Sequence, residues 1–243
     1  YHTEPCSERG QGIARAAEAS LLITDHGVLE RLGGGLPDLD IPVLNLEDLV
    51  DHGSPDAWKP PAINSDSMAY LLFTSGSTGD PKGVIATHGT VLSLVEIAPE
   101  WLGLDASACV VGWAPMHHAM GLLLEVIMPT AYGCGAVLTS TEQFQRRPIF
   151  WLQLISKHRG TTTVGGNFAF ALVTQLATDE QVAELDLSSL RVMVCASEPV
   201  RPETVRGFLR RFASTGLHPD VISPTVGMTE AGIFTAKFVG EPM

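Results

Sequence analysis

Short apolar runs that do not alternate with polar residues recur along this chain, and stretches with helical spacing separate them. The clearest runs are residues 70–73, 109–113 and 191–195, and the clearest helical stretches are residues 151–158, 168–178 and 202–213. The threonine-rich residues 161–164 are also expected to be extended. Strands of a parallel sheet that is covered on both faces give such unbroken apolar runs. The alternation therefore predicts an α/β fold with layered, largely parallel sheets and flanking helices.

Other segments show a less marked strand or helix pattern, and one polar segment resembles a linker between two parts of the chain. We expect further extended segments at residues 20–24, 42–45, 83–87, 136–139 and 220–222, and further helices at residues 10–19, 89–101 and 119–132. Residues 51–67 are polar and contain Pro55, Pro60 and Pro61, which is typical of a linker. We expect a partial N-terminal segment with its linker at residues 1–64 and a nucleotide- and acyl-binding core at residues 65–243.

The composition excludes several classes of protein. The 243 residues carry a net charge of −12, with 45% apolar and only 17% charged residues. Disordered chains combine low hydrophobicity with high charge density, so disorder is not expected. An acidic chain without a basic stripe repels phosphate backbones, so we expect no nucleic-acid partner.

The cysteines and the most apolar run indicate a reduced chain without a membrane span. Cys6, Cys109, Cys134 and Cys195 form no CxxC pair, which favours reduced thiols over a disulfide framework or a zinc site. Residues 120–132 contain Glu125 and fall short of the roughly 20 apolar residues of a span, so a buried helix is the better interpretation. No signal peptide is visible, and we expect a cytoplasmic protein.

The segment Thr74–Gly83, TSGSTGDPKG, carries the chemistry. Glycines let a backbone turn and approach an anion closely, and successive N–H groups can then form a nest for phosphate oxygens. A lysine adds a mobile positive charge that suits a polyphosphate. The candidate phosphate-binding residues are Thr74, Ser75, Gly76, Ser77, Thr78, Gly79 and Lys82.

The residues of this segment disfavour two other interpretations. A Walker A loop has Gly directly before its lysine and Ser or Thr after it, whereas here Pro81 precedes Lys82 and Gly83 follows, which disfavours a phosphate-loop hydrolase. A plain solvent-exposed loop is disfavoured because the whole string directly follows an apolar strand.

The string resembles the signature of the adenylate-forming, AMP-binding enzymes, and further segments are most similar to the fatty acyl-AMP ligases. These segments are WAPMHHAMGL at 113–122, QRRPIFWLQLIS at 145–156, GNFA at 166–169, LDLSSLR at 185–191, SEPVR at 197–201 and GMTE at 227–230. They occur in the order found in that family and extend over nearly the whole chain.

The resemblance implies a function. An enzyme of this family joins a fatty acid to ATP with the help of Mg²⁺ to give an acyl-adenylate, and passes the acyl group to the phosphopantetheine thiol of an acyl carrier protein, as in lipid or polyketide biosynthesis. The implied fold is the N-terminal large domain of such enzymes. The C-terminal lid domain and its lysine would lie beyond residue 243, so this piece alone is expected to be inactive.

The resemblance also implies roles for single residues. The loop from Thr74 to Lys82 would hold the β- and γ-phosphates, and Glu230 would hold Mg²⁺. Gly227, Met228 and Thr229 would contact the nucleotide, with Thr229 on the α-phosphate. Ser197, Glu198 and Pro199 would line the adenine pocket. His118 would lie near the carboxylate and the mouth of the acyl tunnel, so the catalytic candidates are Lys82, His118 and Glu230.

Each of these motifs has a simpler structural interpretation. His117 and His118 are read as part of a strand, where neighbours point to opposite faces, and no third ligand follows at a metal-binding spacing. Glu198 and Pro199 could close a strand and start a helix. The aromatic side chains of Trp151 and Phe168 are expected to pack in the core.

Three positions depart from the family pattern. Ala119 stands where the family has Asp, Val226 where it has a Tyr that stacks on adenine, and Gly166 where it has Pro. Two alternatives therefore stay open beside the ligase: a degenerate module that binds lipid or a protein, and an acyl-CoA ligase.

Overall fold

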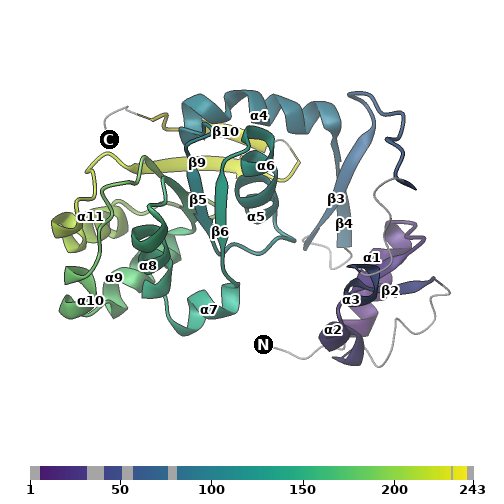
Figure 1. The fold of residues 1–243 in the computed structure, drawn as a ribbon, viewed down its shortest axis with the longest axis horizontal. Helices are drawn as coiled ribbons and strands as arrows, with labels where there is room; N and C mark the ends of the chain where they lie inside the picture. The colour runs from purple at the N-terminus through teal and green to yellow at the C-terminus, as the bar shows by residue number, and fades with distance from the viewer. Residues whose placement is uncertain (1–5, 32–40, 51–56, 76–80, 231, 240–243) are drawn as a thin grey trace. The chain divides into compact units, whose positions relative to one another are not determined.

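The computed structural model describes residues 6–31, 41–50, 57–75, 81–230 and 232–239, and it divides the chain into two compact units, residues 1–89 and 90–243. Figure 1 shows the helices and strands of each unit. The expected functional boundary between residues 64 and 65 stays a prediction.

The smaller unit contains two pairs of strands. Its elements are α1 (Cys6–Ala16), β1 (Leu22–Thr24), α2 (His26–Arg31), β2 (Val43–Asn45), α3 (Leu46–Val50), β3 (Met68–Ser75) and β4 (Pro81–Thr87). Strands β1 and β2 pair in parallel, whereas β3 and β4 pair antiparallel over nearly their whole length. The apolar run at residues 70–73 and the extended segment at residues 83–87 are therefore the two arms of one hairpin.

The larger unit is built around one sheet of six strands. Its strands are β5 (Cys109–Gly112), β6 (Gly135–Leu138), β7 (Thr162–Gly165), β8 (Val192–Cys195), β9 (Ile222–Met228) and β10 (Gly232–Ala236). Their order is β10-β9-β8-β7-β5-β6, and every neighbouring pair is parallel except β10 with β9. The prediction of an α/β fold with a largely parallel sheet is confirmed.

Helices cover both faces of this sheet (Figure 1). They are α4 (His88–Leu102), α5 (Ala119–Gly121), the π-helical η2 (Leu122–Ile127), α6 (Met128–Tyr132), α7 (Thr141–Arg146), α8 (Ile149–His158), α9 (Asn167–Leu176), α10 (Asp179–Ala183), α11 (Pro202–Arg211) and the 3₁₀ turn η3 (Ala213–Thr215). None of the helices among the described residues is long and apolar enough to cross a membrane.

Neighbouring residues of each strand enter opposite cores, which explains the unbroken apolar runs. Val111 and Met193 pack in one cluster with α8, α9 and α11, whereas Val110 and Val192 pack in a second cluster with α4 and α6. A strand that is buried on both faces is therefore mostly apolar. In β7 the buried Thr162 and Thr163 are tolerated because their hydroxyls donate to the carbonyls of Leu102 and Val111.

Some elements differ from the sequence-based expectation. The helix expected at residues 119–132 is broken into α5, η2 and α6. Four short helices, α2, α3, α7 and α10, are not among the expected ones. Of these, α7 begins at the polar cap Ser140 and α10 at the polar cap Thr178. Strand β9 continues to Met228 and turns back as β10, because antiparallel pairing with β10 extends it beyond its short apolar start at Ile222.

The three cysteines whose side chains the structure describes are free thiols, as expected. Cys195 is buried, and burial raises the pKa of its thiol to about 12. Cys109 and Cys134 are free but only half-buried, because they lie at the ends of β5 and β6. The side chain of Cys6 lies outside the described residues.

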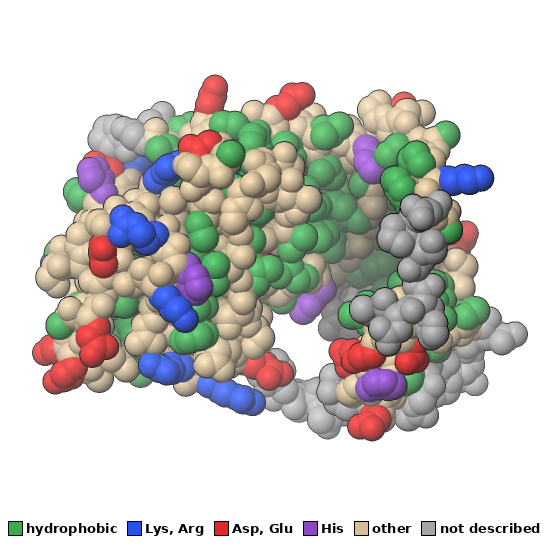
Figure 2. Space-filling view, in the orientation of Figure 1, with side chains coloured by type: hydrophobic (Ala, Val, Ile, Leu, Met, Phe, Trp, Pro, Cys, Tyr) green, Lys and Arg blue, Asp and Glu red, His purple; other side chains and the backbone are tan. Residues whose placement is uncertain are grey.

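Charged side chains of both signs cover the surface of the larger unit. Figure 2 shows acidic and basic groups interspersed on the face that it draws. Several basic groups have acidic partners nearby: Arg211 with Asp179 at 2.8 Å, and Arg191 with Asp105 at 2.9 Å. These exposed pairs each contribute little to stability.

Candidate functional site

The hairpin β3–β4 carries the candidate phosphate loop of the smaller unit. Thr74 pairs with Lys82 and Ser75 with Pro81 at the end of the hairpin, so the two strands bring the threonine and the lysine to neighbouring positions. The Lys82 side chain is exposed. Gly76, Ser77, Thr78 and Gly79 lie outside the described residues, so their expected phosphate contacts stay predictions.

A pocket of about 190 Å³ lies in the larger unit, past the carboxyl ends of β8 and β9. Ligands of open parallel sheets usually bind at this edge, because the loops that follow the strands converge there. The pocket is lined by Leu94, Trp101, His118, Ala119, Met120, Leu123, Leu124, Met128, Val194, Ala196, Ser197, Thr225, Gly227, Met228, Thr229, Gly232 and Ile233.

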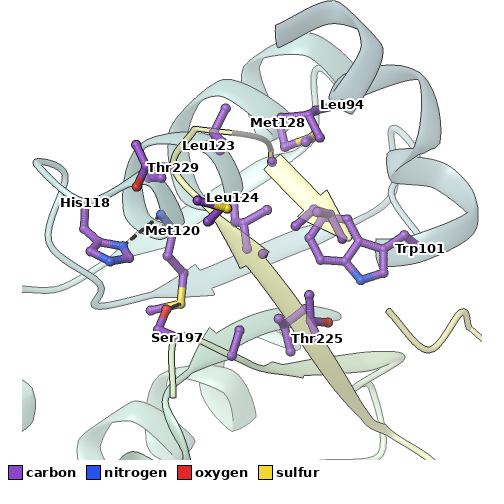
Figure 3. A pocket seen from close by; sticks show the side chains of 17 residues that line it. Leu94, Trp101, His118, Met120, Leu123, Leu124, Met128, Ser197, Thr225 and Thr229 are labelled. Carbon is purple, nitrogen blue, oxygen red and sulfur yellow. Dashed lines mark hydrogen bonds between the residues drawn. The ribbon is translucent and has the colours of Figure 1, made fainter. Parts of the chain in front are cut away.

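The pocket is more polar at one end than at the other. Three of the four polar side chains that line it lie toward one end, whereas the fourth, Thr225, lies nearer Trp101 and donates its hydroxyl to the carbonyl of Ser223 at 3.2 Å. In Figure 3 the side chains of His118, Ser197 and Thr229 lie toward one end, and those of Trp101 and Met128 lie toward the other. Such a gradient fits a molecule with a charged head and an apolar tail.

His118 reaches the pocket from the residue that precedes α5. Its Nδ1 accepts a hydrogen bond of 3.1 Å from the backbone N–H of Met120, drawn as the dashed line in Figure 3. Burial and then the neighbouring His117 lower the pKa of His118, which keeps its ring neutral at pH 7. A neutral ring whose Nδ1 accepts a bond carries its proton on Nε2.

The expectation that this histidine pair belongs to a strand is wrong. Both residues lie in the turn between β5 and α5, because the N–H of His118 bonds to the carbonyl of Pro115 at 3.0 Å and closes that turn. Among the described residues, no three His, Cys, Asp or Glu side chains are grouped as metal ligands.

The segment Ser197–Pro199 follows β8, and Ser197 is its one residue that lines the pocket. Ser197 has a left-handed backbone with φ of 70°, and its Oγ donates to Sδ of Met120 at 3.4 Å. Glu198 turns away to the start of α9, where it accepts a bond of 2.6 Å from the N–H of Phe168. The segment does not start a helix, since α11 begins at Pro202 after Arg201.

The end of β9 and the residue that follows it meet the same pocket. Gly227, Met228 and Thr229 line it, and Glu230 lies exposed in the turn that leads to β10. A side chain at Gly227 would come within 2.5 Å of the carbonyl oxygen of Gly232, so a close approach of two strands requires this glycine. The structure thus gathers His118, Ser197 and residues 227–229 around one pocket.

Sequence reasoning missed the apolar end of the pocket. Leu94, Trp101 and Met128 lie on α4 and α6, whose apolar residues look like ordinary core positions, and no motif distinguishes them. Of the two aromatics expected in the core, Trp151 is buried, but Phe168 is 50% exposed. Phe168 occupies the first turn of α9 and forms T-shaped ring contacts with Trp113 at a centroid distance of 5.9 Å and with Phe144 at 6.3 Å.

Comparison with known proteins identifies relatives over nearly the whole chain. The family model described as AMP-binding enzyme matches residues 6–242. The medium-chain-fatty-acid–[acyl-carrier-protein] ligase JamA of Moorena producens is 36% identical over 94% of this chain. The probable long-chain-fatty-acid–AMP ligase FadD30 of Mycobacterium tuberculosis is 36% identical over 80% of it.

A solved structure shows the same fold. The fatty acyl-adenylate ligase of L. pneumophila, in complex with acyl adenylate and pyrophosphate, aligns with a TM-score of 0.90 and 28% identity over 98% of this chain. The expected likeness to the N-terminal domain of adenylate-forming enzymes is confirmed. The chain spans 39% of the length of JamA and 42% of the L. pneumophila chain.

Proposed function

Because the chain belongs to the family of AMP-binding enzymes, we propose that its protein activates a fatty acid with ATP. A carboxylate oxygen of the acid attacks the α-phosphorus of ATP. The bond from that phosphorus to the β-phosphate oxygen breaks, so acyl-AMP forms and pyrophosphate leaves. We expect the reaction in the cytoplasm, where ATP is available.

The polarity gradient of the pocket is the observation that carries this proposal. A fatty acid has one ionised end and an apolar tail. The apolar end at Leu94, Trp101 and Met128 would accept the tail, and the polar end at His118, Ser197 and Thr229 would face the carboxylate and the α-phosphate. Burying each methylene of the tail contributes about 0.8 kcal/mol of binding.

The residues of the polar end have complementary tasks in this proposal. Neutral His118 donates from Nε2 to the carboxylate and orients it toward the phosphorus, and the hydroxyl of Thr229 donates to an α-phosphate oxygen. Donors that are placed before the reaction stabilise negative charge as it shifts between oxygens. Ser197, Glu198 and Pro199 are proposed as the adenine side of the site, with Gly227 and Met228 beside it.

The loop of the smaller unit is proposed to hold the leaving phosphates. Glycines in its sequence would allow backbone N–H groups to approach the phosphates, and Lys82 offers a mobile positive charge that would offset the charge of pyrophosphate. Thr74 and Ser75 end β3, and the proposal adds Gly76, Ser77, Thr78 and Gly79 from the sequence that follows.

Glu230 is the proposed ligand of Mg²⁺. Its carboxylate is exposed in the turn after Thr229, where it is open to water and to phosphate oxygens. Mg²⁺ prefers oxygen ligands and often takes one protein carboxylate together with waters and phosphates, so this single carboxylate fits. The ion would neutralise phosphate charge.

An acyl carrier protein is the proposed acceptor of the acyl group. The name of JamA specifies an acyl-carrier-protein ligase, and this chain is 36% identical to it. The carrier's thiolate would attack the acyl carbon and AMP would leave. Coenzyme A is the alternative acceptor, and a competition between the two thiols decides between them.

Acid-dependent exchange of labelled pyrophosphate into ATP tests the proposal in the whole protein. We expect exchange that requires a fatty acid, and a loss of about a hundredfold in Lys82→Ala and in Glu230→Ala. Lys59→Ala and Glu96→Ala remove other exposed charges of the same kind and should leave the exchange unchanged.

The other outcomes are equally informative. Absence of exchange in a folded whole protein would contradict the ligase. If the same protein still bound a fatty acid, the degenerate binding module would be favoured, in line with Ala119 lining the pocket without the carboxylate of the family pattern.

A further inference from the structure

Glu125 is a fully buried acidic residue in the π-helical turn η2. Its Oε1 accepts two hydrogen bonds, from the backbone N–H of Trp113 at 3.2 Å and of Ala114 at 3.1 Å. Its Oε2 has no partner among the described residues. A buried oxygen without a partner costs stability, so this carboxyl calls for an explanation other than stability.

The backbone around the carboxyl is shaped to receive it. A side chain at Gly112 would overlap with the carboxyl group, so the last residue of β5 has to be glycine. The widened turn of η2, in which Met128 bonds back to the carbonyl of Leu123, carries Glu125 beside that glycine. Single π-helical turns are frequent at functional sites.

The two amides that Glu125 holds begin the segment that reaches the pocket. This positioned segment, residues 113–118, is also held by Thr141, whose Oγ1 donates to the carbonyl of Trp113 at 3.0 Å. Its far end closes in the turn from Pro115 to His118. Gly121 lies so close beneath it that a side chain there would overlap with the carbonyl oxygen of Pro115.

We propose that Glu125 is a positioning residue that fixes the positioned segment, and through it His118, at the polar end of the pocket. The nature of the ligand rests on the proposed function, whereas the anchoring of the segment does not. Glu125 itself does not line the pocket and acts through the backbone of Trp113 and Ala114.

Two substitutions at Glu125 distinguish the effect of its hydrogen-bond acceptor from the effect of its side-chain volume. Glu125→Gln keeps an oxygen that can accept from both amides, whereas Glu125→Leu fills similar space without any acceptor. Val173→Ala is the matched control, because Val173 is buried in α9 in the same core cluster as the ring of Trp113, so its truncation creates a cavity in that cluster and leaves both hydrogen bonds of Glu125 in place.

Hydrogen exchange of the whole protein tests the anchoring directly. We expect the amides of Trp113 and Ala114 to exchange about tenfold faster in Glu125→Leu, and at nearly the wild-type rate in Glu125→Gln and Val173→Ala. Unchanged exchange in Glu125→Leu, or an equal increase in Val173→Ala, would overturn the proposal.

Kinetics test the consequence for the pocket. We expect Glu125→Leu to raise KM for the acid by about tenfold with a smaller change in kcat, and Glu125→Gln to restore KM. Faster exchange of the segment with an unchanged KM would refute the positioning role. If the wild-type protein shows no adenylation, the proposed function fails, and hydrogen exchange still decides whether Glu125 anchors the segment.

Discussion

Glu198 accepts a hydrogen bond of 2.6 Å from the backbone N–H of Phe168, and this bond ties the segment after β8 to the first turn of α9. A second bond runs in the opposite sense, from the N–H of Arg201 to Oδ1 of Asn167 at 2.9 Å. Together they fix the segment that carries Ser197 into the pocket.

Removal of the Glu198 carboxylate should therefore loosen both the helix start and the pocket wall. We expect Glu198→Ala to lower the free energy of unfolding by about 1–2 kcal/mol, measured by denaturant unfolding, because α9 loses a charged cap. Glu198→Gln should recover part of that loss. A stability equal to that of the surface control Glu96→Ala would show that the bond contributes nothing.

Gly227 offers a test of the turn beside the pocket. Gly227→Ala should destabilise the protein by about 1–3 kcal/mol, because the new methyl group would press on the carbonyl oxygen of Gly232. Gly207→Ala is its control: nothing lies within 4 Å of the added methyl group in α11, and alanine favours helix by up to about 1 kcal/mol. The midpoint temperature of thermal unfolding should fall in Gly227→Ala and rise in Gly207→Ala.

The apolar end of the pocket should set the preferred acid length. Met128 is 1% exposed and lines the pocket, so Met128→Ala should lengthen it and favour acids with one or two more methylenes, by about fourfold in kcat/KM for each. Met193→Ala removes the same side chain from the opposite core, where Met193 is 0% exposed, and should destabilise without changing the preference. If Met128→Ala kept the wild-type preference for acid chain length, the acyl tail would not bind at Met128.

The sequence predicts most of the sheet and part of the pocket. Strands β5 and β8 can be recognised because burial on both faces leaves unbroken apolar runs, and His118 and residues 227–229 can be recognised from short motifs. The hairpin formed by β9 and β10 cannot be predicted in this way, because the pairing of β9 with β10 depends on a partner strand and not on local spacing.

The break in the helix at residues 119–132 escaped prediction for a different reason. Spacing alone predicts a regular helix there, whereas the π-helical turn depends on the fit of Glu125 beside Gly112 on another element. Glu125 was visible in the sequence only as a charge in an apolar run. Leu94 and Trp101 were invisible as pocket residues, because core and pocket apolar positions have the same spacing.

Glu125 should also make stability depend on pH. Burial raises the pKa of its carboxyl to about 7, against the opposing effect of the bonds from Ala114 and Trp113. The folded state then holds its proton more tightly than the unfolded state, whose carboxyl has a pKa of about 4.3. Its contribution to stability is therefore full below about pH 4 and is lost as pH rises to 7, by on the order of 3 kcal/mol.

Glu125→Gln does not titrate, so it should lack this decline. Denaturant unfolding between pH 5 and pH 8 should show a wild-type stability that falls relative to the variant. Other titratable groups on the elements around Glu125, which are Cys109 on β5, His117 and His118 in the turn, and Tyr132 on α6, are the same in both proteins. Parallel pH profiles would contradict the titration of Glu125 near neutral pH.

Calorimetric titration of the whole protein with acyl-sulfamoyl adenosines, stable mimics of the acyl-adenylate, tests whether the pocket binds an activated fatty acid. We expect a medium-chain or long-chain acyl mimic to bind at least about a hundredfold more tightly than the acetyl mimic, because its tail enters the apolar end at Trp101 and Met128. Equal affinity for the two mimics, or no binding of either to a folded protein, would contradict it.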